Sequence, residues 1–87
     1  MISKDITIKV PASASLQPAA ILVQVANQFN SSVRIEVEDK QVNAKSLMGM
    51  LSLTFYPGES IKVITQGEDE TQAMERIEHY LTTAQKN

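Results

Sequence analysis

The chain has 87 residues, of which 43% are apolar and 21% are charged, and its formal net charge is −2. These values predict one soluble globular domain over residues 1–87, and the weak negative charge disfavours nucleic acid or an anionic membrane as a partner. Cysteine is absent and there is one histidine, which excludes disulfides, thiolate chemistry and a multi-histidine metal site within one chain. The sequence has neither a signal-peptide pattern nor an apolar run of membrane length, so we expect a cytoplasmic protein without a metal or cofactor.

The N-terminal part of the sequence is typical of a strand followed by a helix. Apolar residues recur through residues 2–10 with strict alternation from Ile6 to Val10, which predicts a half-buried strand, and the small residues at 11–15 form a loop. A helix is expected from about residue 16 to 28, with Ser15 as its cap and Pro18 in its first turn. Helical spacing then places four residues on one core-facing stripe: Leu22, Val25, Ala26 and Phe29.

The middle of the chain shows the clearest strand signal. Apolar and charged residues alternate over residues 33–37, which predicts a strand with one buried face. Asp39 and Lys40 are expected to form a tight hairpin connection to an antiparallel strand at 41–43. A further strand is predicted over residues 60–65.

The C-terminal part of the sequence predicts a second long helix. Gly67 marks the corner after the strand, and Asp69 and Gln72 have the spacing of a capping box. The helix carries an apolar stripe made of Ala73, Met74, Ile77, Tyr80 and Leu81. The predicted order is therefore β-α-β-β-α-β-α, an α+β open-faced sandwich in which three helices cover one face of a four-stranded antiparallel sheet.

A short helix after Ser46 has unusual chemistry for its length. Ser46 fits an N-cap, and the positive end of the helix dipole there would stabilise a phosphate on its hydroxyl. Four bulky apolar residues follow within two turns, namely Leu47, Met48, Met50 and Leu51. A helix this short cannot bury all four, so some should face solvent or a partner. The residues by themselves leave open whether Ser46 is only a cap or also a modification site.

Catalytic chemistry is not supported by the sequence. His79, with Glu75 and Glu78 nearby, lies off the apolar stripe of the last helix and is expected to be a solvated residue. The three glycines are isolated and form no phosphate-binding loop. Carboxylates gather around the predicted hairpin and at the start of the last helix, where solvation or capping explains them. We therefore expect a protein that is not an enzyme.

The order of elements and three stretches of residues resemble the HPr family, the small phosphocarriers of the bacterial sugar phosphotransferase system, over essentially the full length. The resemblance rests on Pro18–Gln24, on Val42–Gly49 with Ser52 and Leu53, and on Gly67–Glu70. The central stretch is the most specific of the three.

One motif of the family is missing. HPr proteins carry Gly-x-His-Ala-Arg-Pro, whose histidine accepts a phosphoryl group, whereas residues 13–18 here read Ser-Ala-Ser-Leu-Gln-Pro. Ser15 occupies the histidine position and Gln17 occupies the arginine position. A serine hydroxyl without an activating base cannot replace imidazole as a reversible carrier, so relay from phosphoenolpyruvate should be absent.

The resemblance retains a regulatory serine. In the Gram-positive branch of the family, the serine matching Ser46 is phosphorylated by an ATP-dependent HPr kinase/phosphorylase, and the phosphoprotein is a corepressor with the transcription factor CcpA. A branch called Crh lacks the histidine and keeps only this role in carbon catabolite regulation. The resemblance therefore implies a Crh-like regulatory protein whose partner-binding face comprises Gln17, Ala20, Gln24, Leu47, Met48 and Leu51.

Two alternatives stay open. The chain could be an HPr-fold phosphocarrier with an altered acceptor, either Ser15 or His79. It could also be a degenerate interaction module that acts as a homodimer by exchange of the first strand, with residues 11–15 as the hinge.

Overall fold

The structure is a computed structural model that describes residues 1–9, 18–53 and 58–83. Its elements are, in chain order, β1 (Ile2–Thr7), α1 (Pro18–Ala26), β2 (Ser32–Val37), β3 (Lys40–Asn43), α2 (Leu47–Leu51), β4 (Ser60–Gln66) and α3 (Glu70–Thr82). This order confirms the predicted β-α-β-β-α-β-α arrangement.

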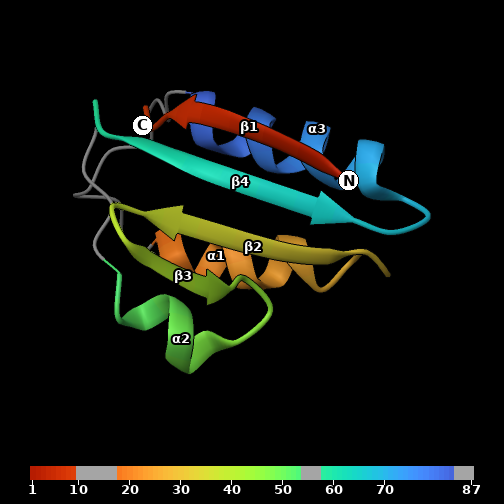
Figure 1. Cartoon of the computed structure of the whole chain (residues 1–87), viewed down its shortest axis with the longest axis horizontal. Helices are drawn as coiled ribbons and strands as arrows, with labels where there is room; N and C mark the ends of the chain where they lie inside the picture. Colours follow the sequence, from red (N-terminus) through yellow and green to blue (C-terminus); the bar gives the residue numbers. More distant parts are fainter. Residues whose placement is uncertain (10–17, 54–57, 84–87) are drawn as a thin grey trace.

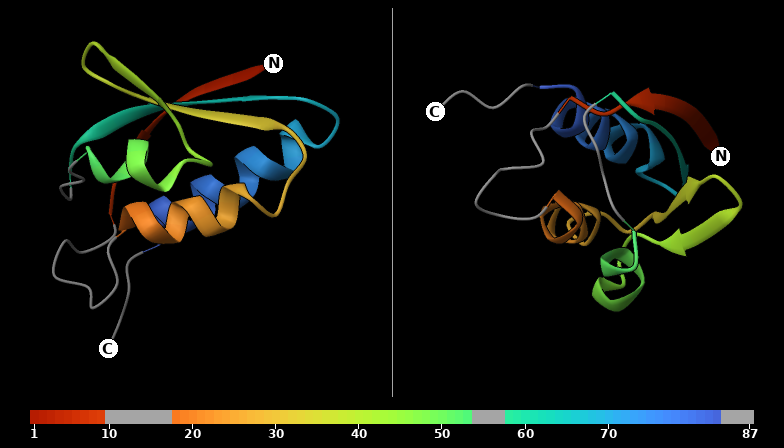
Figure 2. Two further views of the ribbon diagram at one scale, coloured as in Figure 1. Left: turned by 90° about the horizontal axis from the view of Figure 1, so that it is seen from below. Right: turned by 90° about the vertical axis from the view of Figure 1, so that its left-hand side faces the viewer.

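The strands form one four-stranded sheet in the order β1-β4-β2-β3, and each neighbouring pair is antiparallel. Helices α1 and α3 lie side by side on one face of the sheet, and α2 lies on the same side near the edge strand β3 (Figures 1 and 2). The predicted open-faced sandwich is confirmed. On its opposite face lie polar residues that alternate with core residues, such as Arg34 between Val33 and Ile35.

The core lies between the sheet and the helices. The helical stripes predicted from 3.6-residue spacing are buried in it, although Phe29 and Tyr80 are only half-buried at its margin. Burial of this apolar surface is the main force that fixes the helices on the sheet. The largest side chains with no exposed surface are Ile8, Ile35, Met50, Ile77 and Leu81.

Two predicted element ends differ from the structure because backbone partners change there. The first strand was predicted to reach Val10, but β1 ends at Thr7, and the N–H of Lys9 donates instead to the carbonyl of Leu81 at 2.8 Å. Val10 and the predicted cap Ser15 lie outside the described residues. Helix α1 was predicted to reach residue 28 but ends at Ala26. It is closed by a turn in which the N–H groups of residues 28 and 29 donate to the carbonyls of the third residue before each.

The hairpin between β2 and β3 is one residue earlier than predicted. Val37 pairs with Lys40, so Glu38 and Asp39 form the turn, and Lys40 belongs to the strand. Glu38 adopts a φ of 55°, a left-handed conformation that side chains with a Cβ rarely adopt. Register rather than local composition decides the position of this turn.

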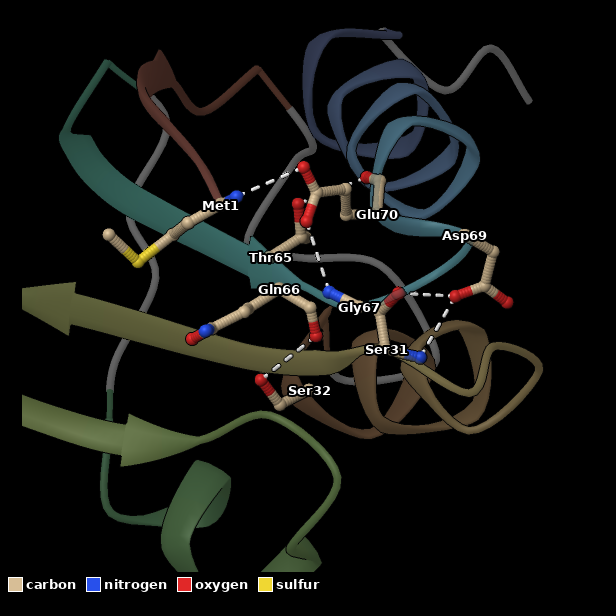
Figure 3. A network of polar contacts seen from close by, with 8 residues as sticks. All are labelled: Met1, Ser31, Ser32, Thr65, Gln66, Gly67, Asp69 and Glu70. Carbon is tan, nitrogen blue, oxygen red and sulfur yellow. Dashed lines mark hydrogen bonds and ion pairs between the residues drawn. The ribbon is translucent and has the colours of Figure 1, made fainter.

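The predicted capping box at the start of α3 is wrong. Asp69 is the N-cap residue, but its side chain makes no capping hydrogen bond. Its carboxylate instead accepts hydrogen bonds from the backbone N–H and the hydroxyl of buried Ser31 (Figure 3), the first at 2.9 Å. It also accepts one from the backbone N–H of Asn30 at 2.9 Å. These donors, the Ser31 hydroxyl first among them, lower the pKa of Asp69 below its ordinary value of 3.8. The carboxylate thus joins α3 to the loop before β2.

Glu70 and Gly67 complete this polar network. The Glu70 carboxylate accepts a hydrogen bond from the Gly67 N–H at 3.0 Å and lies 3.0 Å from the Met1 amino group. The pKa of Glu70 is lowered mainly by the Gly67 N–H and then by that amino group. Gly67 has a φ of 149°, and a Cβ there would lie 2.6 Å from the Ser31 Oγ. The corner predicted at Gly67 is confirmed, and the close approach of Ser31 requires glycine there.

Candidate functional site

Ser46 lies directly before α2 and caps it. Its backbone is extended, with φ −102° and ψ 113°, and its Oγ accepts a hydrogen bond from the Gly49 N–H at 3.3 Å. The Ser46 carbonyl accepts the N–H of Met50 at 3.0 Å, which closes the first helical turn. The N-cap prediction is confirmed, and the residue is exposed to solvent.

Helix α2 divides its bulky apolar side chains between core and solvent. Met50 is fully buried, whereas Leu47, Met48 and Leu51 are 48%, 86% and 51% exposed. A helix of five residues presents one narrow face to the core, so only one of the four large residues is buried completely. We call the exposed trio, Leu47, Met48 and Leu51, the α2 patch.

The segment before Ser46 is hydrogen-bonded to the residues at the end of α1. The Lys45 ammonium donates a hydrogen bond to the Phe29 carbonyl at 2.7 Å, in the turn that follows α1. The Asn27 side-chain amide donates to the Val23 carbonyl at 2.8 Å and to the Lys45 carbonyl at 3.4 Å. These bonds fix Ser46 relative to α1 as well as to its own helix.

The same bonds decide which face of α1 lies beside the site. Ala20 and Gln24 precede Asn27 by two turns and one turn of helix, so the three residues share a face. Ala20 is half-buried and Gln24 is exposed. Helical spacing therefore puts Ala20 and Gln24 on the face of α1 that continues into Asn27, whose side chain is bonded to the Lys45 carbonyl. Asn27 and Lys45 were missed from the sequence, where each is simply a polar residue, because their contacts are tertiary.

The remaining candidate residues are distributed as follows. Ser15 and Gln17 lie outside the described residues. His79 is exposed on α3, and its carbonyl accepts hydrogen bonds from the Thr83 N–H at 3.0 Å and from the Thr83 hydroxyl. Across the described ranges, no three His, Cys, Asp or Glu side chains are grouped to hold a metal ion. None of the helices described is long and apolar enough to cross a membrane.

A small antiparallel open-faced sandwich with an exposed capping serine beside an apolar patch is the class of protein that the fold and the site define. Residues 2–83 match the family described as the PTS HPr component phosphorylation site, so the chain belongs to the HPr family. It is 44% identical to the HPr-like protein Crh of Halalkalibacterium halodurans over 77 residues, which cover 88% of this chain and 92% of that protein.

Solved structures agree with the fold. The phosphocarrier protein HPr of Bacillus anthracis superimposes with a TM-score of 0.82 at 36% identity, covering 93% of this chain and 96% of that one. Crh of Bacillus subtilis superimposes with a TM-score of 0.71 at 37% identity over the whole of both chains, and that protein was solved as a dimer with a swapped domain. The resemblance to the HPr family and to its Crh branch, stated from the sequence, is thus confirmed.

Proposed function

We propose that this chain is a non-catalytic regulatory protein of the Crh type, phosphorylated on Ser46 by an ATP-dependent HPr kinase/phosphorylase in the cytoplasm. The observation that carries the proposal is the position of Ser46, an exposed N-cap residue directly beside the α2 patch. A phosphate there adds about −1.5 to −2 charges at the positive end of a helix, where it is tolerated best. The modification changes the charge of a surface that already exposes three large apolar side chains.

The phosphoprotein is proposed to bind a CcpA-like transcription regulator through the α2 patch and the adjacent face of α1. Exposed methionine and leucine side chains supply adaptable apolar contacts, and the phosphate supplies a charged anchor for basic residues of the partner. Gln17 stands where the family carries an arginine that contacts partners. We therefore expect Gln17→Arg to tighten binding of the phosphoprotein to the regulator, measured by calorimetry, and Met48→Ser to weaken it. Equal affinities of all three proteins would place the interface elsewhere.

The test of the modification is intact mass after incubation with ATP, Mg²⁺ and an HPr kinase/phosphorylase. The unmodified sequence should gain one phosphate and Ser46→Ala none. The variant should stay folded, because loss of an N-cap hydrogen bond costs only about 1 kcal/mol. If neither protein gained a phosphate, Ser46 would have the role of a helix cap alone.

Phosphoryl relay from phosphoenolpyruvate is not part of the proposed function. Neither Ser15 nor the exposed His79 is proposed as a carrier, and incubation with the first phosphotransferase enzyme and labelled phosphoenolpyruvate should leave the chain unlabelled. Robust labelling would instead favour a phosphocarrier with an altered acceptor, which Ser15→Ala and His79→Ala would then locate.

A second candidate function is dimerisation by exchange of β1, favoured by the swapped domain of Bacillus subtilis Crh. Among the residues that the structure describes, β1 is an edge strand of the sheet and pairs with β4 through residues Ile2 to Thr7. The same pairing could be made with a second copy without loss of a contact. Mass measured by light scattering across a range of concentrations tests this, and a monomer at every concentration would refute it.

A further inference from the structure

Gly49 is the one glycine of this chain that neither backbone conformation nor packing explains. The other two, Gly58 and Gly67, have φ values of 92° and 149°, where a side chain is strained. Gly49 has no such positive φ and lies within α2. A Cβ built there would have its nearest neighbours at 3.6 and 3.7 Å, which is ordinary van der Waals contact.

Alanine would therefore fit at this position and would favour the helix. Glycine in a helix is less stable than alanine because it loses more backbone freedom on folding. The fold thus gives no reason for the missing side chain, and the reason should lie in what a side chain would cover.

A side chain at position 49 would lie over the Ser46 hydroxyl. In a helix each Cα–Cβ bond tilts toward the N-terminus, so the residue three positions after the cap points back at it. The three heavy atoms nearest to the built Cβ are the Ser46 Oγ at 3.6 Å, the Ser46 Cβ at 3.7 Å and the Val42 Cβ at 3.7 Å. Within the described part of the chain, the hydroxyl has one hydrogen bond, which it accepts from the Gly49 N–H at a long 3.3 Å.

We propose that Gly49 makes Ser46 accessible to the modifying enzyme. Because position 49 has no side chain, the Ser46 hydroxyl is open to a phosphoryl donor. The inference rests on the proposed phosphorylation of Ser46. In that step the Oγ forms a bond to the γ-phosphorus of a nucleoside triphosphate, and the bond from that phosphorus to the β,γ-bridging oxygen breaks. Nucleoside diphosphate leaves, and the hydroxyl proton passes to a base of the modifying enzyme. Gly49 is a positioning residue in this step and takes part in no bond change.

The test is the steady-state phosphorylation of Gly49→Ala by an HPr kinase/phosphorylase with ATP and Mg²⁺. We expect kcat/KM to fall by about tenfold or more, mainly through kcat, because small displacements of a reacting atom are costly while the α2 patch is unchanged. The melting temperature should equal or exceed that of the unmodified sequence. Thr71→Ala, at an exposed position on α3, controls for a general effect of helix stabilisation.

Three outcomes would overturn the inference. Phosphorylation of Gly49→Ala at an unchanged rate would show that the Cβ does not restrict access. A lower melting temperature would show that glycine is needed for the fold after all. A loss confined to KM would assign Gly49 to docking. Failure of the proposed function would give a different result: the unmodified sequence would not be phosphorylated, although a reference HPr protein in the same assay would be.

Discussion

The carboxylate of Asp69 accepts hydrogen bonds from both the backbone N–H and the hydroxyl of Ser31, a residue 38 positions earlier in the chain. Asp69 stands at the start of α3 and Ser31 directly before β2. This pair therefore holds the corner between β4 and α3 against the turn that follows α1 (Figure 3). Removing either partner leaves hydrogen-bonding groups of a tertiary contact without their partners.

The stability of the protein should fall in acid because of this contact. The pKa of Asp69 is lowered by the Ser31 hydroxyl and the neighbouring N–H groups, so the unfolded chain binds the proton first as the pH decreases. The contribution is fully present above the ordinary value of 3.8 and is lost as the pH falls through the lower folded value. Urea unfolding of Asp69→Asn should show a smaller free energy than the unmodified chain at pH 7, with a difference that shrinks below about pH 4. A constant difference would contradict the assignment.

Replacement of Gly67 should be strongly destabilising. A Cβ at this position would lie 2.6 Å from the Oγ and 2.7 Å from the Cα of Ser31, at a φ of 149°. Strain and overpacking together predict a loss of about 2–4 kcal/mol for Gly67→Ala in urea unfolding. The same substitution at Gly49 is the matched control, since its Cβ meets only ordinary contacts. Equal losses at both positions would contradict the geometry.

The Lys45 ammonium should contribute measurably to stability. Its 2.7 Å hydrogen bond to the Phe29 carbonyl is partly buried, so Lys45→Met should cost about 1–2 kcal/mol. Lys4→Met is the control, because the Lys4–Glu78 ion pair has exposed side chains and should contribute less than about 0.5 kcal/mol. Denaturation midpoints measured in urea compare the two, and a larger effect at Lys4 would refute the prediction.

The hairpin turn offers a stabilising substitution. Glu38 adopts a left-handed φ of 55° and Asp39 does not. Glu38→Gly should therefore raise the free energy of unfolding by about 0.5–1 kcal/mol, because glycine adopts this conformation without strain. Asp39→Gly should lower it, since it only adds freedom to the unfolded chain. The two substitutions are at adjacent positions, and thermal unfolding should show that they change the free energy of unfolding in opposite directions.

The sequence by itself determined the element order, the sheet, the buried stripes and the cap at Ser46. Each of these depends on spacing within one segment, such as the alternation around Val33 and Ile35 or the helical repeat through Met74 and Ile77. Such spacing is fixed by backbone geometry and therefore survives folding unchanged. The exposure of the α2 patch also followed from the sequence, because a helix of that length has only one buried face.

The tertiary structure decided which of several possible partners each polar group takes. Asp69 has the spacing of a capping box, but Ser31 and Asn30 offer its carboxylate three donors and outcompete its own helix. Lys45 and Asn27 connect the Ser46 segment to α1 across 16 and 18 positions of sequence. The turn at Glu38 was displaced by the register between β2 and β3. These partners are distant in sequence and are brought together by the tertiary fold, so the local pattern carries no information about these choices.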